Sequence, residues 1–220
     1  MPVEKNEIQK VQPQLPSNET PRPIEVHMEQ SGGKGKQYGF VEHYEDHKKV
    51  AIYLPSDMDE DDDNTPDQVD LDLSCYNLFV IADEMFKGKY FVVPKDHAIA
   101  VDKCTPNDLW ELAYLTEECI NIVKTFPAIF ASTNHQFART DDRHRAFFGI
   151  VRDVQVKEDG IWIYFFKYRK FAQQILNEQK EVFGIGGTDF KNELDETHWA
   201  IKKVDVVEAL NNNGCTIRLL

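Results

Sequence analysis

Hydrophobic and polar positions alternate in several short segments of the chain, as they do in β-strands. Segments rich in β-branched and aromatic residues predict strands at residues 37–44, 49–54, 77–83, 89–93, 97–101, 197–204 and 215–220. The first two should pair as a hairpin that turns at residues 45–48. Residues 146–168 alternate on both sides of a turn at residues 157–160, which predicts a second hairpin. The second strand of this hairpin is apolar or aromatic on both faces, so we expect it inside a sheet.

Three segments carry helix signals. The Thr105-Pro106 pair is a good helix start, and hydrophobic residues at helical spacing predict a helix from there to Pro127. A second helix is predicted over residues 171–183, with Gly184 as its C-cap. A third, at residues 205–214, opens with the spacing of a capping box. Strands and helices that do not alternate regularly predict an α+β fold, with mainly antiparallel strands and two or three helices.

The first thirty residues differ in composition from the rest. They contain five prolines and no aromatic residue, and such a segment buries too little apolar surface to offset the entropy of ordering. We therefore predict a disordered tail over residues 1–30 and an α+β globular region over residues 31–220. Within this region we expect residues 31–133 and 134–220 either to form two subdomains or to share one hydrophobic core. An acidic loop is expected at residues 57–70.

Charge is distributed unevenly. The net charge is −13 for the whole chain, and residues 1–70 hold 7 basic and 16 acidic residues while residues 134–220 hold 13 of each. A strongly negative protein repels phosphate at long range, which disfavours a dedicated nucleic-acid binder but leaves room for a local phosphate site. The acidic run is instead expected to bind a basic surface of a partner protein, or to remain a solvated loop. Its residues are Asp59, Glu60, Asp61, Asp62 and Asp63.

Several classes of protein and site are disfavoured. The chain lacks an N-terminal apolar signal segment and a run of 18 apolar residues, and its four dispersed cysteines are typical of reduced thiols. We expect a cytoplasmic or other soluble intracellular protein that binds no membrane. No metal site or cofactor is predicted. Counted from Asp57 as a calcium loop, the sixth and twelfth positions are Asp62 and Gln68, which do not fit.

The densest cationic group runs from Arg139 to Arg145. Arg139 and His144 have the Arg-x4-His spacing, which resembles that of metal-independent ribonucleases of the higher eukaryote and prokaryote nucleotide-binding type. The resemblance implies that a neutral His and a phosphate-binding Arg would support attack by a ribose 2′-OH. Those ribonucleases are helical bundles, however, whereas a strand is predicted here from Ala146. In the alternative interpretation the arginines pair with neighbouring acidic residues on a solvated loop.

Candidate site residues follow from these patterns. The catalytic candidates are His144 or His198, acting with Arg139 or Arg143; His198 beside Trp199 also fits a structural histidine. The predicted anion-binding residues are Arg139, Arg143, Arg145, Lys167, Arg169 and Lys170. No Ser-His-Asp, H-E-x-x-H or G-x-S-x-G arrangement is present.

The segment Lys36 to Val41 is a weaker candidate for binding single-stranded nucleic acid. Tyr38 and Phe40 alternate about a glycine after a basic residue, and the segment partly resembles the first RNA-binding motif of cold-shock proteins. An ordinary edge hairpin explains it equally. The sequence alone therefore favours a soluble binding or regulatory protein that uses its acidic N-terminal half. An enzyme that processes RNA or another phosphate ester is the alternative, and a single-stranded nucleic-acid binder is the second alternative.

Overall fold

The computed structural model describes residues 48–53, 68–100 and 105–218. The predicted tail, the segment with Tyr38 and Phe40, and the acidic residues Asp59 to Asp63 lie outside this part of the chain. The described strands are β1 (Lys49–Tyr53), β2 (Gln68–Asp72), β3 (Tyr76–Val80), β4 (Tyr90–Val93), β5 (Pro127–Ala131), β6 (Arg145–Lys157), β7 (Gly160–Ala172) and β8 (His198–Lys202). The helices are α1 (Glu117–Thr125), α2 (Gln174–Glu178) and α3 (Val206–Asn212), with 3-10 turns η1 (Lys95–His97), η2 (Asn107–Tyr114) and η3 (Glu193–Asp195).

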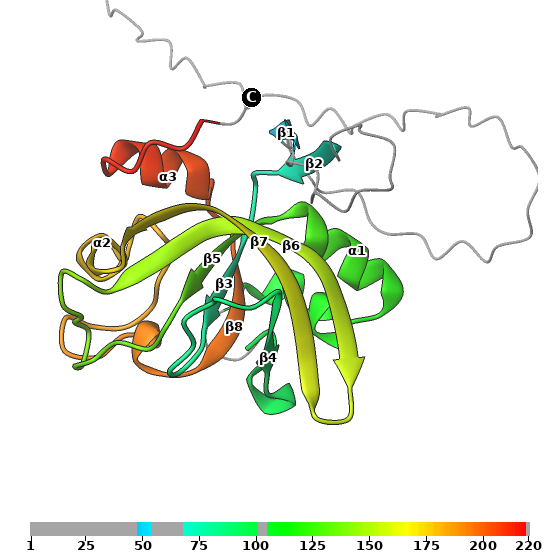
Figure 1. The fold of residues 1–220 in the computed structure, drawn as a ribbon, viewed down its shortest axis with the longest axis horizontal. Coiled ribbons are helices and arrows are strands. Elements are labelled where there is room, and N and C mark those ends of the chain that lie inside the picture. Colours follow the sequence, from blue (N-terminus) through cyan, green and yellow to red (C-terminus); the bar gives the residue numbers. More distant parts are fainter. Residues whose placement is uncertain (1–47, 54–67, 101–104, 219–220) are drawn as a thin grey trace, which may run out of the picture. The chain divides into compact units, whose positions relative to one another are not determined.

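Six strands form one curled sheet in the order β4-β7-β6-β5-β3-β8 (Figure 1). All neighbouring pairs are antiparallel except β3 and β5, which run parallel. The chain crosses between these two through β4, η2 and α1. Strands from residues 71–133 and from residues 134–220 thus share one sheet, and the mixed α+β content agrees with the prediction. A separate two-stranded sheet pairs β1 with β2.

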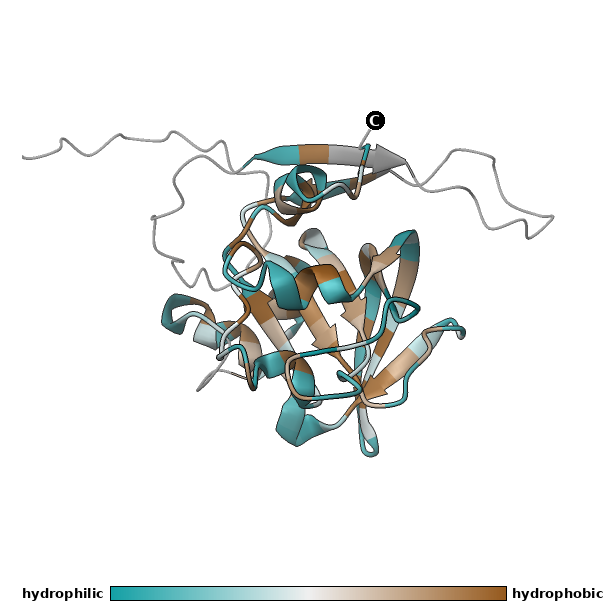
Figure 2. Cartoon of the chain, turned by 90° about the vertical axis from the view of Figure 1, so that its left-hand side faces the viewer, coloured by the Kyte–Doolittle hydropathy of each residue, from teal (hydrophilic) through white to brown (hydrophobic). Residues whose placement is uncertain are grey.

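Both faces of the six-stranded sheet are covered. One face packs under α2, α3 and the segment after α3, with Leu78, Phe148 and Leu210 among its buried residues. The other packs against η2 and α1, with Phe79, Val123 and Trp199 at its centre. Side chains of β3 alternate between the two clusters, as strand geometry requires. Figure 2 shows hydrophobic stretches along the strands and hydrophilic ones on the loops.

The long hairpin is the best-predicted element. β6 and β7 pair from Arg145 with Ala172 to Lys157 with Gly160, and the two residues between form the predicted turn. β7 lies between β4 and β6, as expected for an interior strand. Residues 49–53 form the predicted strand, but its partner here is β2. The acidic loop predicted at residues 57–70 is therefore wrong for residues 68–70, which pair as a strand, and the rest of it lies outside the described residues. β3, β4, β8 and α3 also match predicted segments.

The helix predicted from Thr105 to Pro127 is wrong as one continuous element. The 3-10 helix η2 ends at Leu115, which has a left-handed backbone (φ 49°), and α1 starts afterwards, capped by the side chain of Thr116. Thr105 does not cap a helix. Its buried hydroxyl accepts a hydrogen bond from the backbone N–H of Ile201 (3.1 Å), so this residue joins the helical segment to β8.

Three other predicted segments differ from the structure. Residues 97–100 include the end of η1 rather than a strand, and the described residues after Gly214 form no strand. The helix predicted over residues 171–183 shrinks to α2 because β7 continues to Ala172 and takes the first of its hydrophobic positions. Gly184 does end the following turn with a left-handed backbone (φ 63°).

Candidate active site

One end of the six-stranded sheet gathers several candidate site residues. Because β3 and β5 are parallel, their carboxyl ends meet, and the antiparallel strands β6 and β8 start at the same end. His144 directly precedes β6, and His198 opens β8 opposite Val80. Ligands often bind at the carboxyl ends of parallel strands. We call residues 81–86, 132–144, 173–178 and 184–198 the carboxyl end.

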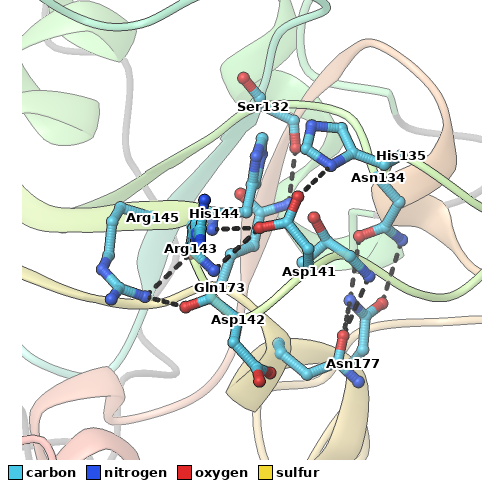
Figure 3. Close-up of polar contacts among 12 residues, drawn as sticks. Ser132, Asn134, His135, Asp141, Asp142, Arg143, His144, Arg145, Gln173 and Asn177 are labelled. Atoms are coloured by element: carbon cyan, nitrogen blue, oxygen red, sulfur yellow. Dashed lines mark hydrogen bonds and ion pairs between the residues drawn. The ribbon is translucent and has the colours of Figure 1, made fainter.

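His135, Asp141 and His144 form a compact cluster between β5 and β6 (Figure 3). The Nδ1–H of His135 donates to Oδ2 of Asp141 (2.9 Å), and the two imidazole rings meet edge to face with centroids 4.3 Å apart. The other carboxylate oxygen of Asp141 accepts from the backbone N–H groups of Arg143 (2.8 Å) and His144 (3.0 Å). One carboxylate therefore orients one imidazole and fixes the backbone that carries the other.

The electrostatics of this cluster favour a neutral His144. Burial of the ring, and then the neighbouring His135, lower the pKa of His144 below its ordinary value of 6.5, with Asp141 acting in the opposite direction. The pKa of Asp141 is also lowered, chiefly by the backbone N–H of Arg143 and further by His135. At neutral pH His144 is thus an unprotonated base beside an ionised carboxylate.

Four buried side-chain atoms in the described residues lack a hydrogen-bond partner. They are Thr140 Oγ1, His144 Nε2, Gln173 Oε1 and His198 Nε2. All four belong to the carboxyl end. Leaving a buried polar atom unpaired costs roughly 1–3 kcal/mol, so such atoms call for an explanation. Their concentration at one end of the sheet marks this end as the candidate site.

A network of side-chain amides holds the loop that carries the cluster. Asn134 Nδ2 donates to Asp195 Oδ1 (2.7 Å) and to Asn177 Oδ1 (3.0 Å), and Asn192 Nδ2 also donates to Asn177 Oδ1 (2.7 Å). Gln173 Nε2 donates to the carbonyl of Ser132 (2.8 Å). These bonds join the loop after β5 to α2 and η3. The loop that carries both histidines is therefore held by α2, η3 and the residues that precede them.

A tight turn follows His135. Gln136 and Arg139 exchange two backbone hydrogen bonds (3.0 and 3.1 Å), and Ala138 has a left-handed backbone (φ 52°). Its N–H donates to Oδ1 of Asp195 (2.8 Å). A left-handed alanine is strained and persists only where its surroundings hold it. Such strain is common at functional sites.

A groove of about 670 Å³ is lined by residues 96–100 and by residues of the segment 186–198, and none of the three residues of the histidine cluster lines it. His198 lines it with a side chain that is 7% exposed. Its Nδ1–H donates to the carbonyl of Glu196 (2.9 Å), and its Nε2 lies 3.5 Å from Oε2 of Glu193. Both carboxylate oxygens of Glu193 accept from the buried Lys202 (2.7 and 2.8 Å). The predicted structural reading of His198 is therefore incomplete, since one ring nitrogen has no hydrogen bond.

The predicted anion-binding residues do not form one patch. Arg139, Arg143 and Arg145 lie exposed on the loop of the histidine cluster, with Arg145 Nη1 donating to the carbonyl of Asp142 (2.6 Å). Lys167 is partly buried, donates to the carbonyl of Phe86 and lies over the Phe147 ring. These contacts stabilise the hairpin.

The remaining two cations point to opposite faces of β7. Lys170 pairs with Phe147 and Arg169 with Phe148, which pack on opposite faces of the sheet. Arg169 lines a small pocket with Tyr168, Thr216 and Arg218, on the α3 side. The structure thus brings together the arginines of the loop but not the six predicted cations.

The sequence patterns did not single out His135, Asp141 or Gln173. The local signal for Asp141 is its position three residues before His144. A short acidic side chain there can accept backbone hydrogen bonds and close a turn. Nothing local could reveal Gln173 or Asp195, since these residues reach the loop only through the fold.

The remaining findings concern the described chain outside the histidine cluster. Cys75, Cys119 and Cys215 are buried free thiols, and burial raises the pKa of Cys75 to about 11. Among the described residues no three His, Cys, Asp or Glu side chains lie close enough to share a metal ion. No helix in this part of the chain is long and apolar enough to cross a membrane. Comparisons with models of protein families, with curated proteins and with solved structures found no match.

Proposed function

We propose that the protein is an enzyme that cleaves RNA or another phosphate ester with the histidines of the carboxyl end. The observation that carries this proposal is the pair of adjacent imidazoles, one bonded to Asp141 and the other buried with an unpaired Nε2. Phosphoryl transfer between oxygens needs a base for the attacking hydroxyl and an acid for the leaving oxygen. Two histidines in different environments supply both groups.

His144 acts as the base. In its neutral form it removes the proton from the attacking hydroxyl, and that oxygen forms a bond to phosphorus as the bond to the leaving oxygen breaks. His135, held by its hydrogen bond to Asp141, gives a proton to the leaving oxygen. Arg139 and Arg143, exposed on the same loop, neutralise the phosphate charge.

An activity survey tests this function. The purified full chain is incubated with single-stranded RNA and with nucleoside 2′,3′-cyclic phosphates. Replacing His144 by Gln should lower the rate of cleavage by roughly 100-fold or more, because the general base is lost. Asp142→Asn is the control, since Asp142 contacts Arg145 through its backbone carbonyl. The proposal fails if neither substrate is cleaved or if the His144→Gln variant cleaves at the original rate.

A second function rests on the charge of the N-terminal part. Residues 1–70 hold 7 basic and 16 acidic residues, and this asymmetry supports binding to a basic surface of a partner protein. Deleting residues 1–30 and neutralising the acids of residues 57–63 should abolish capture of that partner in a pull-down. Unchanged capture would remove this function while leaving the enzyme proposal intact.

A further inference from the structure

Two phenylalanine rings stand out among the exposed side chains of the carboxyl end. Phe137 is 72% exposed at the tip of the turn after His135, and Phe190 is 85% exposed at the tip of the turn before η3. Burying a Phe side chain is worth roughly 1.5–3 kcal/mol, so both rings leave this stabilisation unused.

Both rings are held out by ordered turns. The Phe137 turn is fixed by the paired backbone bonds of Gln136 and Arg139 and by the bond from Ala138 to Asp195. In the Phe190 turn, Thr188 Oγ1 accepts from the N–H of Phe190 (3.2 Å), and the base of the turn is closed by a bridge between residues 187 and 192. The hydrogen bonds of the two turns present the rings in defined positions.

The two rings also differ from other exposed aromatic side chains of the described chain. Trp110 packs edge to face on Tyr114 (5.3 Å), Tyr90 stacks on Trp162 (4.1 Å), and Tyr168 packs on Phe148 (6.3 Å). Within the described residues Phe137 and Phe190 have no such aromatic partner. Their faces are thus open to a planar group from outside.

We propose that Phe137 and Phe190, exposed on two turns of the carboxyl end, stack with bases of single-stranded RNA. Every base has a π-face, so an exposed aromatic ring accepts it without regard to sequence. Arg139 follows the Phe137 turn and Arg143 lies further along the same loop, where their guanidinium groups can meet the backbone phosphates. This inference rests on the proposed phosphoester chemistry and names its substrate.

The groove lies at the base of the Phe190 turn. The base of the Phe190 turn, at Gly187 and Asn192, forms one wall of the groove, and His198 lies in its lining. An amino or hydroxyl group of the nucleoside held on Phe190 can donate a hydrogen bond into this lining, where Nε2 of His198 lies 3.5 Å from the carboxylate oxygen Oε2 of Glu193. Single-stranded RNA offers both groups, on its base edges and at its 2′-OH.

Binding of an uncleavable probe tests the inference apart from catalysis. Fluorescence anisotropy is measured with the full chain and a labelled single-stranded 2′-O-methyl RNA, which lacks the attacking hydroxyl. Phe137→Ala and Phe190→Ala should each weaken binding by roughly 5- to 100-fold, the range typical of a lost base–aromatic stack. Phe137→Trp should retain binding. Tyr114→Ala, which removes a side chain that is 66% exposed but lies on η2, should leave binding within about twofold.

The outcomes separate this inference from the proposed function. Weaker binding in both Phe variants, with the Asp142→Asn variant binding like the original protein, supports the stacking assignment even if cleavage is absent. Equal binding by all variants, or a loss in Tyr114→Ala as large as in Phe137→Ala, overturns it even if RNA is cleaved. A probe that does not bind at low salt overturns it as well.

Discussion

His135 and His144 are adjacent, yet the chain gives them different surroundings. The ring of His135 is half exposed and bonded to the carboxylate of Asp141, whereas that of His144 is more buried and has an unpaired nitrogen. Burial favours the neutral ring of His144. The two residues thus lie in different environments, as the assignment of one as the acid and the other as the base requires.

Two adjacent carboxylates allow a matched test of this arrangement. Asp141→Asn removes the acceptor charge from His135 and weakens the loop bonds to Arg143 and His144, so cleavage should fall by roughly 10- to 1,000-fold. Asp142→Asn should stay within about twofold, because it preserves the backbone carbonyl that Arg145 contacts. Rates are compared on the same RNA substrate. Equal losses in the two variants would contradict the role given to Asp141.

The pKa of His144 also makes stability depend on pH. Its folded-state pKa lies below that of the unfolded chain, so near and below pH 6.5 the unfolded state binds more protons. The stabilising contribution of neutral His144 is present above this window and is lost as the pH falls through it. In urea denaturation, the original protein should lose more unfolding free energy between about pH 7.5 and about pH 5 than His144→Gln does. If the unfolding free energies of the two proteins changed equally with pH, folding would not lower the pKa of His144.

At the scale of elements, the position of the site depends on how closely the strands pack. Gly149 lies in β6 where an added Cβ would come within 2.0 Å of the carbonyl oxygen of Phe166 and 3.0 Å of the Phe130 ring. The glycine thus permits β6 and β7 to approach and the bulge beside it to form. That bulge separates Lys167 from Arg169, which accounts for the division of the predicted cationic patch.

Gly149→Ala should therefore destabilise the fold. The backbone oxygen cannot move without displacing β7, so we expect a loss of roughly 1–3 kcal/mol in unfolding free energy. Gly186→Ala is the control, because an added Cβ at Gly186 meets no atom within 4 Å. Both variants are compared by urea denaturation. A Gly149→Ala protein as stable as the control would show that β6 and β7 do not approach as described.

At the scale of the whole molecule, local patterns predicted the elements better than their arrangement. Strict alternation and a tight turn made the β6–β7 hairpin predictable, and the Asp205 cap did the same for α3. The parallel pairing of β3 with β5 was not predictable, because it depends on packing across a long crossover. Arg139 and His144 could be chosen from their spacing. The contact of their loop with Gln173 and Asp195 could not, since those residues lie on other elements.

The measurement that tests the central claim most directly is the pH dependence of kcat/KM for cleavage of a short single-stranded RNA by the full chain. His144 as a neutral base predicts that the rate rises with pH through a midpoint below 6.5, and that His144→Gln loses roughly 100-fold or more at neutral pH. If kcat/KM rose with a midpoint above pH 6.5, or if the His144→Gln variant kept the original rate, the assignment of His144 as the catalytic base would be contradicted.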